Sequence, residues 1–309
     1  MTAVLRAGVA GAGVFGGYHA RKYAEARGVE LVGVYDRGTG RAETLAAQIG
    51  APVFRAEQWD EFIAALDVLT IAAPAVAHAS LAVKALEAGV HVYVEKPIAA
   101  SVQESEAILA AAREAGRVVA CGHQERIVFQ EMGLFSTAER PTRIEAVRRG
   151  PWTGRSDDVS VVLDLMIHDI DLALTLAGED PATVAAKGRK VESALSDDTR
   201  AEIGFPGGLT AVFHASRVAE ERERMMRVVY PPGELEIDFI SRTFENSTPF
   251  PLNAHFAETV RGRDPLGASV SDFLAAVRGQ ATRPAVTGEE AARALLLALT
   301  VDQAADAAG

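Results

Sequence analysis

The stretch that decides the fold is AVLRAGVAGAGVFGG, residues 3–17. Its first half has the short apolar character of a β-strand. Three glycines then form G-x-G-x-x-G: Gly11, Gly13 and Gly16. Between a strand and a helix, the first glycine permits a tight turn, the second lets a pyrophosphate approach the backbone, and the third lets the helix pack on the strand. The start of that helix, around Val14 and Phe15, would offer N–H groups and positive dipole to the phosphates.

The residues after this loop support a dinucleotide site. A second strand-like run, VELVGVYD (29–36), ends at Asp36, 20 residues beyond Gly16. A carboxylate there can accept hydrogen bonds from ribose hydroxyls and would repel the 2′-phosphate of NADP. NADP stays an alternative cofactor, because Arg37 or Arg41 could pair with that phosphate. The pattern therefore predicts a cofactor site that favours NAD; the alternative is a structural turn capped by an aspartate.

Strands and helices alternate through the first 121 residues. Apolar strands are predicted at 67–73 and 90–95, and helices at 78–89 and 101–115. Strands without clean alternation, separated by helices of about three turns, are typical of a parallel sheet covered on both faces. The predicted fold class is α/β, with a doubly wound Rossmann domain over residues 1–121. In such sheets ligands bind at the carboxyl ends of the strands.

A charged pair ends the predicted strand at 90–95. The sequence there reads Glu95–Lys96–Pro97, on the ligand edge of the sheet. Surface charge is the simpler explanation. However, a lysine at this edge would lie near a nicotinamide ring, and Pro97 fixes its own φ and restricts the backbone of Lys96. That combination is a way to aim one side chain at a ligand.

Four polar side chains interrupt an apolar helix predicted at 161–178. They stand at i, i+4, i+7 and i+11, which places them on one narrow stripe: Asp164, His168, Asp171 and Thr175. Such a stripe faces either a wet cleft or a buried network. Asp164 and His168 are one turn apart, so the carboxylate can hold one imidazole nitrogen while the other exchanges a proton with a substrate.

Two other interpretations of this stripe stay open. His168 can be a core histidine with satisfied hydrogen bonds. Two aspartates and a histidine could also hold a divalent metal ion. No further His or Cys stands at a suitable spacing, so we expect no metal.

After Cys121, itself expected as small core filler, the pattern changes to consecutive strands. Six are predicted, at 142–150, 183–189, 199–205, 209–217, 223–231 and 233–239, with a hairpin turn at 206–208. Strands without intervening helices favour an antiparallel sheet, so residues 122–309 are expected to form an α+β domain, closed by helices at 269–279 and 288–306. The run at 220–227 alternates in charge and is expected as an exposed edge strand.

The composition limits the partners. Acidic residues outnumber basic ones by 42 to 31, for a formal net charge of −11. This balance argues against nucleic acid or an anionic membrane. One cysteine excludes a disulfide framework within the chain, and no apolar run reaches the ~18 residues of a membrane span. We therefore expect a cytoplasmic protein that acts on small molecules.

Three segments together resemble the Gfo/Idh/MocA oxidoreductases: GAGVFG (11–16), APAVAHASLAVKALEAGVHVYVEKP (73–97) and GHQER (122–126). Members of this family use NAD(P) on sugars, inositols and related polyols. The resemblance implies that Lys96 contacts the nicotinamide ribose and the reacting hydroxyl. The cofactor-binding residues expected from the motif and the resemblance are Gly11, Gly13, Val14, Phe15, Gly16, Asp36, Arg37, Ala73, Pro74, His78, Glu95 and Lys96.

D-x-x-x-H-x-x-D matches the second signature of this family, which implies that His168 is the acid/base and that Asp164 orients it. Asp171 is either a substrate contact or scaffold. The expected catalytic residues are Lys96, Asp164 and His168, and the expected substrate contacts are these three with His123, Arg126 and Trp152. Trp152 lies in a predicted loop at 148–158 whose three arginines would suit a diphosphate. Relatives commonly pair subunits through one face of the second-domain sheet, so a homodimer or homotetramer is expected.

Within the family, the runs at 157–174 and 264–279 are most similar to the branch that acts at C3 of UDP-N-acetylglucosamine. Two alternatives stay open. Some relatives are glycosidases that recycle NAD, and others are sugar-sensing regulators that have lost the catalytic lysine. The presence of Lys96, Asp164 and His168 together favours an NAD-dependent sugar dehydrogenase.

Overall fold

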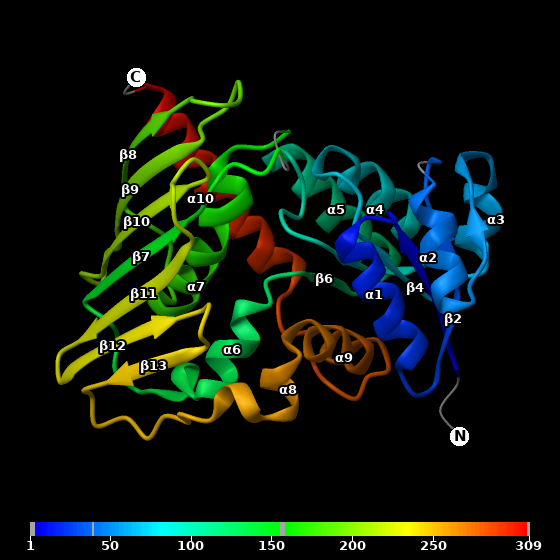
Figure 1. Ribbon diagram of the computed structural model, residues 1–309. Coiled ribbons are helices and arrows are strands. Elements are labelled where there is room, and N and C mark those ends of the chain that lie inside the picture. Colours follow the sequence, from blue (N-terminus) through cyan, green and yellow to red (C-terminus); the bar gives the residue numbers. More distant parts are fainter. Residues whose placement is uncertain (1–3, 39, 155–157, 308–309) are drawn as a thin grey trace. The chain divides into compact units, whose positions relative to one another are not determined.

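The computed structural model of the protein describes residues 4–38, 40–154 and 158–307 (Figure 1). The chain divides into two compact units, residues 1–124 with 264–292, and residues 125–263 with 293–309. The expected boundary after residue 121 differs from this division chiefly in the segment 264–292. That segment lies with the nucleotide-binding sheet, because its helix packs against the first helix and the fifth strand of that unit.

The first unit contains a six-stranded, fully parallel sheet in the order β3-β2-β1-β4-β5-β6. Its strands are β1 (Leu5–Ala10), β2 (Val29–Tyr35), β3 (Val53–Phe54), β4 (Val68–Ile71), β5 (His91–Val94) and β6 (Val119–Cys121). The strand order reverses between β1 and β4, and doubly wound folds bind their ligands at that switch point. The predicted Rossmann sheet is confirmed.

Helices cover both faces of this sheet. They are α1 (Val14–Glu25), α2 (Arg41–Ile49), α3 (Trp59–Ala64), α4 (His78–Glu87), α5 (Val102–Ala115) and α9 (Pro265–Val277), with the short 3₁₀ turns η1 (Ala56–Gln58) and η2 (Ala75–Ala77). Ala7 and Val9 of β1 share a core with residues of α1 and α9, whereas Gly8 faces Phe62 and Leu66. Successive residues of a strand point to opposite faces, and from residue 7 to residue 10 both faces of β1 are buried, so this part of the strand is apolar, whereas Arg6 before it is exposed.

The second unit contains a seven-stranded sheet in the order β13-β12-β11-β7-β10-β9-β8. Its strands are β7 (Arg143–Arg149), β8 (Thr183–Arg189), β9 (Asp198–Gly204), β10 (Thr210–Ser216), β11 (Glu223–Tyr230), β12 (Gly233–Asp238) and β13 (Thr243–Asn246). All neighbours are antiparallel except β7 and β10, which are parallel. The predicted α+β domain with an open, mostly antiparallel sheet is confirmed.

The expectation of an edge strand at 220–227 is wrong. β11 pairs with β7 on one side and with β12 on the other. The edge on that side of the sheet is β13, a short strand that the sequence pattern did not predict and that pairs with β12.

Helices α6 (Glu125–Met132), α7 (Ile167–Ala177) and α10 (Gly288–Ala307) lie along one face of this sheet (Figure 1). The remaining helical segments are α8 (Val260–Arg263), η3 (Leu134–Ser136), η5 (Phe256–Glu258) and the π-helical η4 (Val162–Met166). The helix predicted at 161–178 therefore begins with a π-helical stretch, and it ends at Gly178 with a φ of +66°. No helix in the described part of the chain is long and apolar enough to cross a membrane.

Candidate active site

The glycine loop between β1 and α1 has the shape that a dinucleotide requires. Gly11 has a φ of +107°, and a Cβ there would lie 2.5 Å from the carbonyl oxygen of Ala72. A Cβ on Gly16 would overlap the carbonyl oxygen of Gly11. Around Gly13, by contrast, no described atom lies within 4 Å of the Cβ position. Gly11 and Gly16 are therefore needed for close packing, and Gly13 leaves open space, which suits the approach of a pyrophosphate to the backbone.

The start of α1 and the end of β2 complete the predicted nucleotide site. No side chain caps the first turn of α1, and Val14 and Phe15 there are about half exposed. Asp36 follows β2 and accepts hydrogen bonds from the N–H groups of Ala12 (2.9 Å) and Gly38 (3.0 Å). Carboxylate oxygens have further lone pairs, so Asp36 can hold the glycine loop and still accept ribose hydroxyls. These residues fit a dinucleotide.

His78 ties together the loops that follow β4 and β5. Its ring is buried, with Nδ1 2.8 Å from the carbonyl oxygen of Pro97 and Nε2 2.8 Å from that of Ala73. Ala73 and Pro74 lead into η2 and α4, as the predicted cofactor border requires. Lys96 is half-buried at the other loop, where the Lys96–Pro97 peptide bond is cis. The histidine thus connects the predicted cofactor border to the predicted catalytic lysine.

Glu95 is buried, so the simple interpretation of a surface charge pair does not hold for it. Its Oε1 lies 2.7 Å from Nε2 of His19 and accepts a hydrogen bond from Gln124 Nε2 (3.2 Å). Burial raises the pKa of Glu95, but the hydrogen bond and charge of His19, with Lys96, outweigh it and lower the pKa below its usual value. Nothing in the sequence pattern pointed to His19, since it lies on α1, far from Glu95 in the chain.

His123 follows β6 and is also buried. Its backbone N–H donates a hydrogen bond to the backbone carbonyl of Cys121 (3.0 Å). Gly122, just before it, is required by Glu95: a Cβ at 122 would lie 2.6 Å from the Glu95 carboxylate. The segment GHQER therefore packs against the end of β5 through its glycine. The role of His123 toward a substrate stays a prediction.

His168 lies on α7 in the second unit, where its Nδ1 is 2.7 Å from Oε2 of Glu125. The ring is half-buried, as is Asp164 on the preceding η4. The helical spacing predicted a partner for His168 on its own helix, whereas Glu125 comes from α6, 43 residues away. Its position in GHQER, directly before the predicted contact Arg126, was the available signal.

The π-helical η4 alters the predicted stripe. Its i→i+5 hydrogen bonds change the angle per residue, so one uniform helical spacing does not run from Asp164 to Thr175. Further along, Asp171 is buried and accepts two hydrogen bonds from Arg126, Nε to Oδ2 (2.8 Å) and Nη2 to Oδ1 (2.7 Å). Thr175 bonds back to the carbonyl of Asp171. These contacts give Asp171 and Arg126 a structural role as a buried ion pair.

Two of the three arginines expected in a loop at 148–158 belong to β7 instead. Arg148 is buried and donates to Asp169 (3.2 and 2.9 Å) and to Glu125 (3.0 Å). Arg149 pairs with Glu223 at 2.6 Å. Arg155 lies outside the described residues. The two described guanidinium groups are thus neutralised within their own unit, which does not support the expected diphosphate contact.

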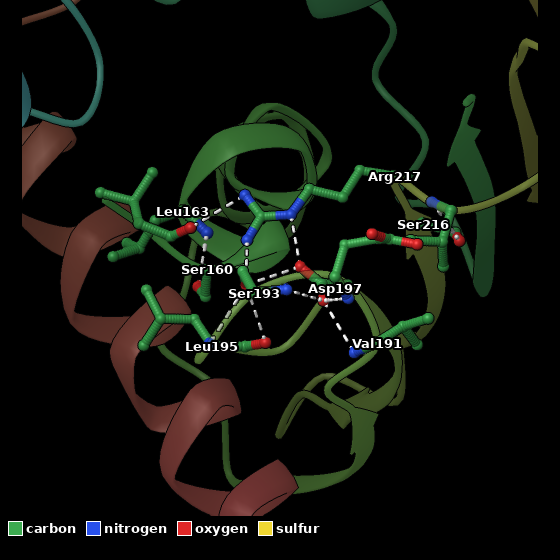
Figure 2. A network of polar contacts seen from close by, with 11 residues as sticks. Ser160, Leu163, Val191, Ser193, Leu195, Asp197, Ser216 and Arg217 are labelled. Carbon is green, nitrogen blue, oxygen red and sulfur yellow. Dashed lines mark hydrogen bonds and ion pairs between the residues drawn. The ribbon is translucent and has the colours of Figure 1, made fainter. Parts of the chain in front are cut away.

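Trp152 lies against Arg217, which belongs to the polar network around Asp197 shown in Figure 2. Asp197 is buried and accepts hydrogen bonds from three successive backbone N–H groups and from Arg217 Nε (2.7 Å). Arg217 also donates to the carbonyl of Val159 (3.0 Å), and its guanidinium lies 5.1 Å from the centroid of the Trp152 ring. Burial raises the pKa of Asp197, but the N–H donors of Ser193 and Val191 outweigh it and lower the pKa. Trp152 and Val159 are therefore fixed to one buried ion pair.

The described residues contain no group of three His, Cys, Asp or Glu side chains that could hold a metal ion. Lys96 belongs to the first unit and His168 to the second. Lys96 follows the buried Glu95, in one of the two loops that His78 connects by hydrogen bonds. His168 contacts Glu125.

Comparisons with known proteins give the family. Residues 5–123 match the family model described as "Oxidoreductase family, NAD-binding Rossmann fold". Residues 133–236 match the model described as "GFO/IDH/MocA C-terminal domain". Between them the two models cover most of the chain.

Among curated relatives, UDP-N-acetylglucosamine 3-dehydrogenase of Acidithiobacillus ferrooxidans is 34% identical over 306 residues, which is 95% of each chain. A solved structure of that enzyme superposes with a TM-score of 0.89 at 33% identity, over 98% of both chains. The NAD⁺-dependent scyllo-inositol 2-dehydrogenase of Bacillus subtilis is 27% identical over 70% of this chain and 68% of its own. The chain therefore belongs to the Gfo/Idh/MocA family of NAD-binding oxidoreductases.

Proposed function

We propose that this protein is an NAD-dependent dehydrogenase that oxidises the C3 hydroxyl of UDP-N-acetylglucosamine. The observation that carries the proposal is the full-length similarity to the dehydrogenase of that specificity from A. ferrooxidans. The residues that such a reaction needs are present, namely Lys96, Asp164 and His168. His168 is half-buried and held by a carboxylate, which suits a proton acceptor.

The first unit would hold the cofactor, which when bound accepts a hydride from the substrate carbon. The open side of Gly13 and the uncapped start of α1 would bind the pyrophosphate. Asp36 would accept the ribose hydroxyls. We favour NAD over NADP, because a carboxylate held in place by two backbone N–H groups repels a 2′-phosphate.

The chain itself supplies the proton transfer. As the C3–H bond breaks, the hydroxyl must lose its proton to leave a ketone, and His168 accepts that proton. Lys96 would position the same oxygen and polarise it, which stabilises the negative charge that develops there. Together these two groups would provide the base and the electrostatic stabilisation for oxidation, and Asp164, half-buried on η4, is the third predicted catalytic residue.

The direct test follows reduced-nicotinamide absorbance with NAD or NADP and a panel of sugars: UDP-N-acetylglucosamine, UDP-glucose, N-acetylglucosamine and myo-inositol. Lys96→Met and His168→Ala should each lower kcat/KM by about 10²–10⁴-fold while NAD still binds. Matched controls are Lys84→Met on the exposed side of α4 and His255→Ala, also exposed, and both should retain full activity.

Two outcomes would contradict the proposal. Release of a free sugar without net reduced cofactor would indicate the glycosidase alternative. Binding of NAD and a UDP-sugar without any turnover would indicate a sensor.

A further inference from the structure

Four charged or titratable side chains form a continuous array on the helix-covered face of the second unit. Nδ1 of His168 contacts Glu125 Oε2 (2.7 Å), and Glu125 Oε1 accepts from Arg148 Nη1 (3.0 Å). Arg148 also donates from Nε and Nη2 to Asp169 (3.2 and 2.9 Å). The members come from α6, β7 and α7, so three elements fix the geometry. We call His168, Glu125, Arg148 and Asp169 the His168 array.

The carboxylate decides which nitrogen of His168 carries the hydrogen. Burial raises the pKa of Glu125, but the charges of His168 and Arg148 outweigh it and lower the pKa well below its usual range. An ionised carboxylate can only accept a hydrogen bond. The 2.7 Å contact therefore requires Nδ1–H, and Nε2 of the neutral ring is left as the atom that accepts a proton.

The rest of the array holds Glu125 in that state. Arg148 is buried, and although burial lowers its pKa, Asp169 and Glu125 raise it further, so it stays charged. Its guanidinium also lies 5.4 Å from the Phe239 ring centroid, within the range of a cation–π contact. Two carboxylates against one guanidinium leave one negative charge, and this charge favours a protonated His168 ring.

Other charged groups face the array from the surrounding elements. They are Asp164 on η4, Arg224 on β11, and the Arg126–Asp171 pair that links α6 to α7. Arg224 is half-buried, and its pKa is lowered by burial and by Arg148. Arg126 and Asp171 neutralise each other. Glu125 is the carboxylate at hydrogen-bond distance from Nδ1, so its charge acts there directly.

We propose that Glu125 is the positioning residue for His168: it fixes the Nδ1–H tautomer, raises the basicity of the ring and aims Nε2 at the substrate hydroxyl, while Arg148 and Asp169 hold Glu125 in place. The use of that basicity in catalysis rests on the proposed function. The tautomer and the ring's titration are properties of this chain alone and can be measured without substrate.

The first experiment uses the wild-type protein. Long-range ¹H–¹⁵N correlation spectra of ¹⁵N-histidine-labelled protein report the tautomer of each of the seven histidines, and the signals lost in His168→Asn assign the ring. The proposal predicts the Nδ1–H tautomer for neutral His168. The Nε2–H tautomer would overturn it, whatever happens to any variant.

The second experiment compares Glu125→Gln with Glu131→Gln. Glu131 lies on the same helix, where it accepts from Thr259 (2.7 Å) and Arg261 (3.0 Å), so it is a matched carboxylate without a histidine partner. Glu125→Gln should move the titration midpoint of His168 to lower pH by about one unit or more. Glu131→Gln should leave it in place. An unchanged midpoint in Glu125→Gln, or an equal shift in both variants, would contradict the proposal.

Kinetics separates this inference from the proposed function. If the protein oxidises the UDP-sugar, Glu125→Gln should lower kcat at least about 10-fold with little change in KM. The acid limb of its pH–kcat profile should follow the titration midpoint downward. If the tautomer and midpoint are as predicted but no sugar is oxidised, the positioning role stands and the proposed function fails. If the UDP-sugar is oxidised but the titration midpoint of His168 does not move in Glu125→Gln, the proposed function stands and the positioning role of Glu125 fails.

Discussion

At the scale of single residues, we assign two roles to Asp36: it holds the glycine loop, and it binds the cofactor. Its carboxylate accepts a hydrogen bond from the N–H of Ala12 inside the glycine loop, and we predict that it also accepts hydrogen bonds from the ribose hydroxyls. Asp36→Asn keeps the size and one acceptor oxygen but removes the charge. Hydrogen bonds to charged groups contribute about 1.5–3 kcal/mol. We therefore expect the Kd for NADH to rise about 10- to 100-fold, while the Kd for NADPH rises less or falls.

Calorimetric titration with NADH and NADPH checks this, with the exposed Asp60→Asn on α3 as the control. An unchanged ratio of the two affinities in Asp36→Asn would remove Asp36 from the choice between NAD and NADP.

For Glu95, the sequence pattern did not distinguish a surface charge from a buried carboxylate. Its buried contact with His19 predicts that Glu95→Gln lowers the free energy of unfolding by about 1–3 kcal/mol, since the amide can replace only part of a charged hydrogen bond. Urea unfolding measures this, and Glu87→Gln on the exposed side of α4 should have almost no effect. Equal stability of the two variants would mean that the His19 contact contributes nothing to the fold.

At the scale of elements, periodicity predicted the helix at 161–178 but not its π-helical start. Periodicity assumes one angle per residue, and η4 breaks that assumption between Asp164 and His168. The same assumption hid Glu125, because a pattern within one helix cannot identify a partner from another. Arg148 stood in both the predicted strand at 142–150 and the predicted loop at 148–158. The strand is confirmed as β7, in which Arg148 is paired on both sides and buried.

The start of η4 is held by α10. Ser160 Oγ donates to Asp302 Oδ2 (2.6 Å) and accepts from the Leu163 N–H (3.2 Å). Burial raises the pKa of Asp302 to about 6. A carboxyl whose folded pKa lies above its unfolded value stabilises the fold at low pH, and this stabilisation is lost as the pH rises from about 4 through about 6.

Asp302→Asn should therefore be more stable than wild type above about pH 6, by about 1–3 kcal/mol, with a smaller difference near pH 4. Urea unfolding across this pH range measures the difference, and the exposed Glu220→Gln should show no such pH dependence. A difference that is the same at every pH would mean that Asp302 does not titrate with folding.

At the scale of the whole molecule, the predictions that succeeded rest on repeated local signals. The glycine loop, the apolar strands and the intervening helices together specified the parallel sheet, whose order β3-β2-β1-β4-β5-β6 is that of the fold class. The return of 264–292 to the first unit was not predictable from these signals. It depends on tertiary contacts such as the hydrogen bond between Tyr93 and Ser269 (2.9 Å) and the ion pair of Lys22 with Asp264 (2.7 Å).

The assembly of the protein stays a prediction: a homodimer or homotetramer, paired through the sheet face opposite α7 and α10. Val212 lies on that face in the middle of β10, between the buried Ala211 and Phe213. Light scattering after size exclusion should give two or four chains per particle for wild type. Val212→Glu should lower this number, and Val260→Glu, at an exposed site outside the sheet, should not. A monomeric wild type would contradict the prediction.

The most direct test of the central claim is isotopic. UDP-N-acetylglucosamine carrying deuterium at C3 is incubated with the protein and NAD, and the reduced cofactor is analysed by mass spectrometry. A dehydrogenase acting at C3 should give singly deuterated reduced nicotinamide, whereas the same sugar deuterated at C4 should give unlabelled reduced cofactor. Reduced cofactor without label from the C3-deuterated sugar, or no reduced cofactor from either sugar, would contradict the account.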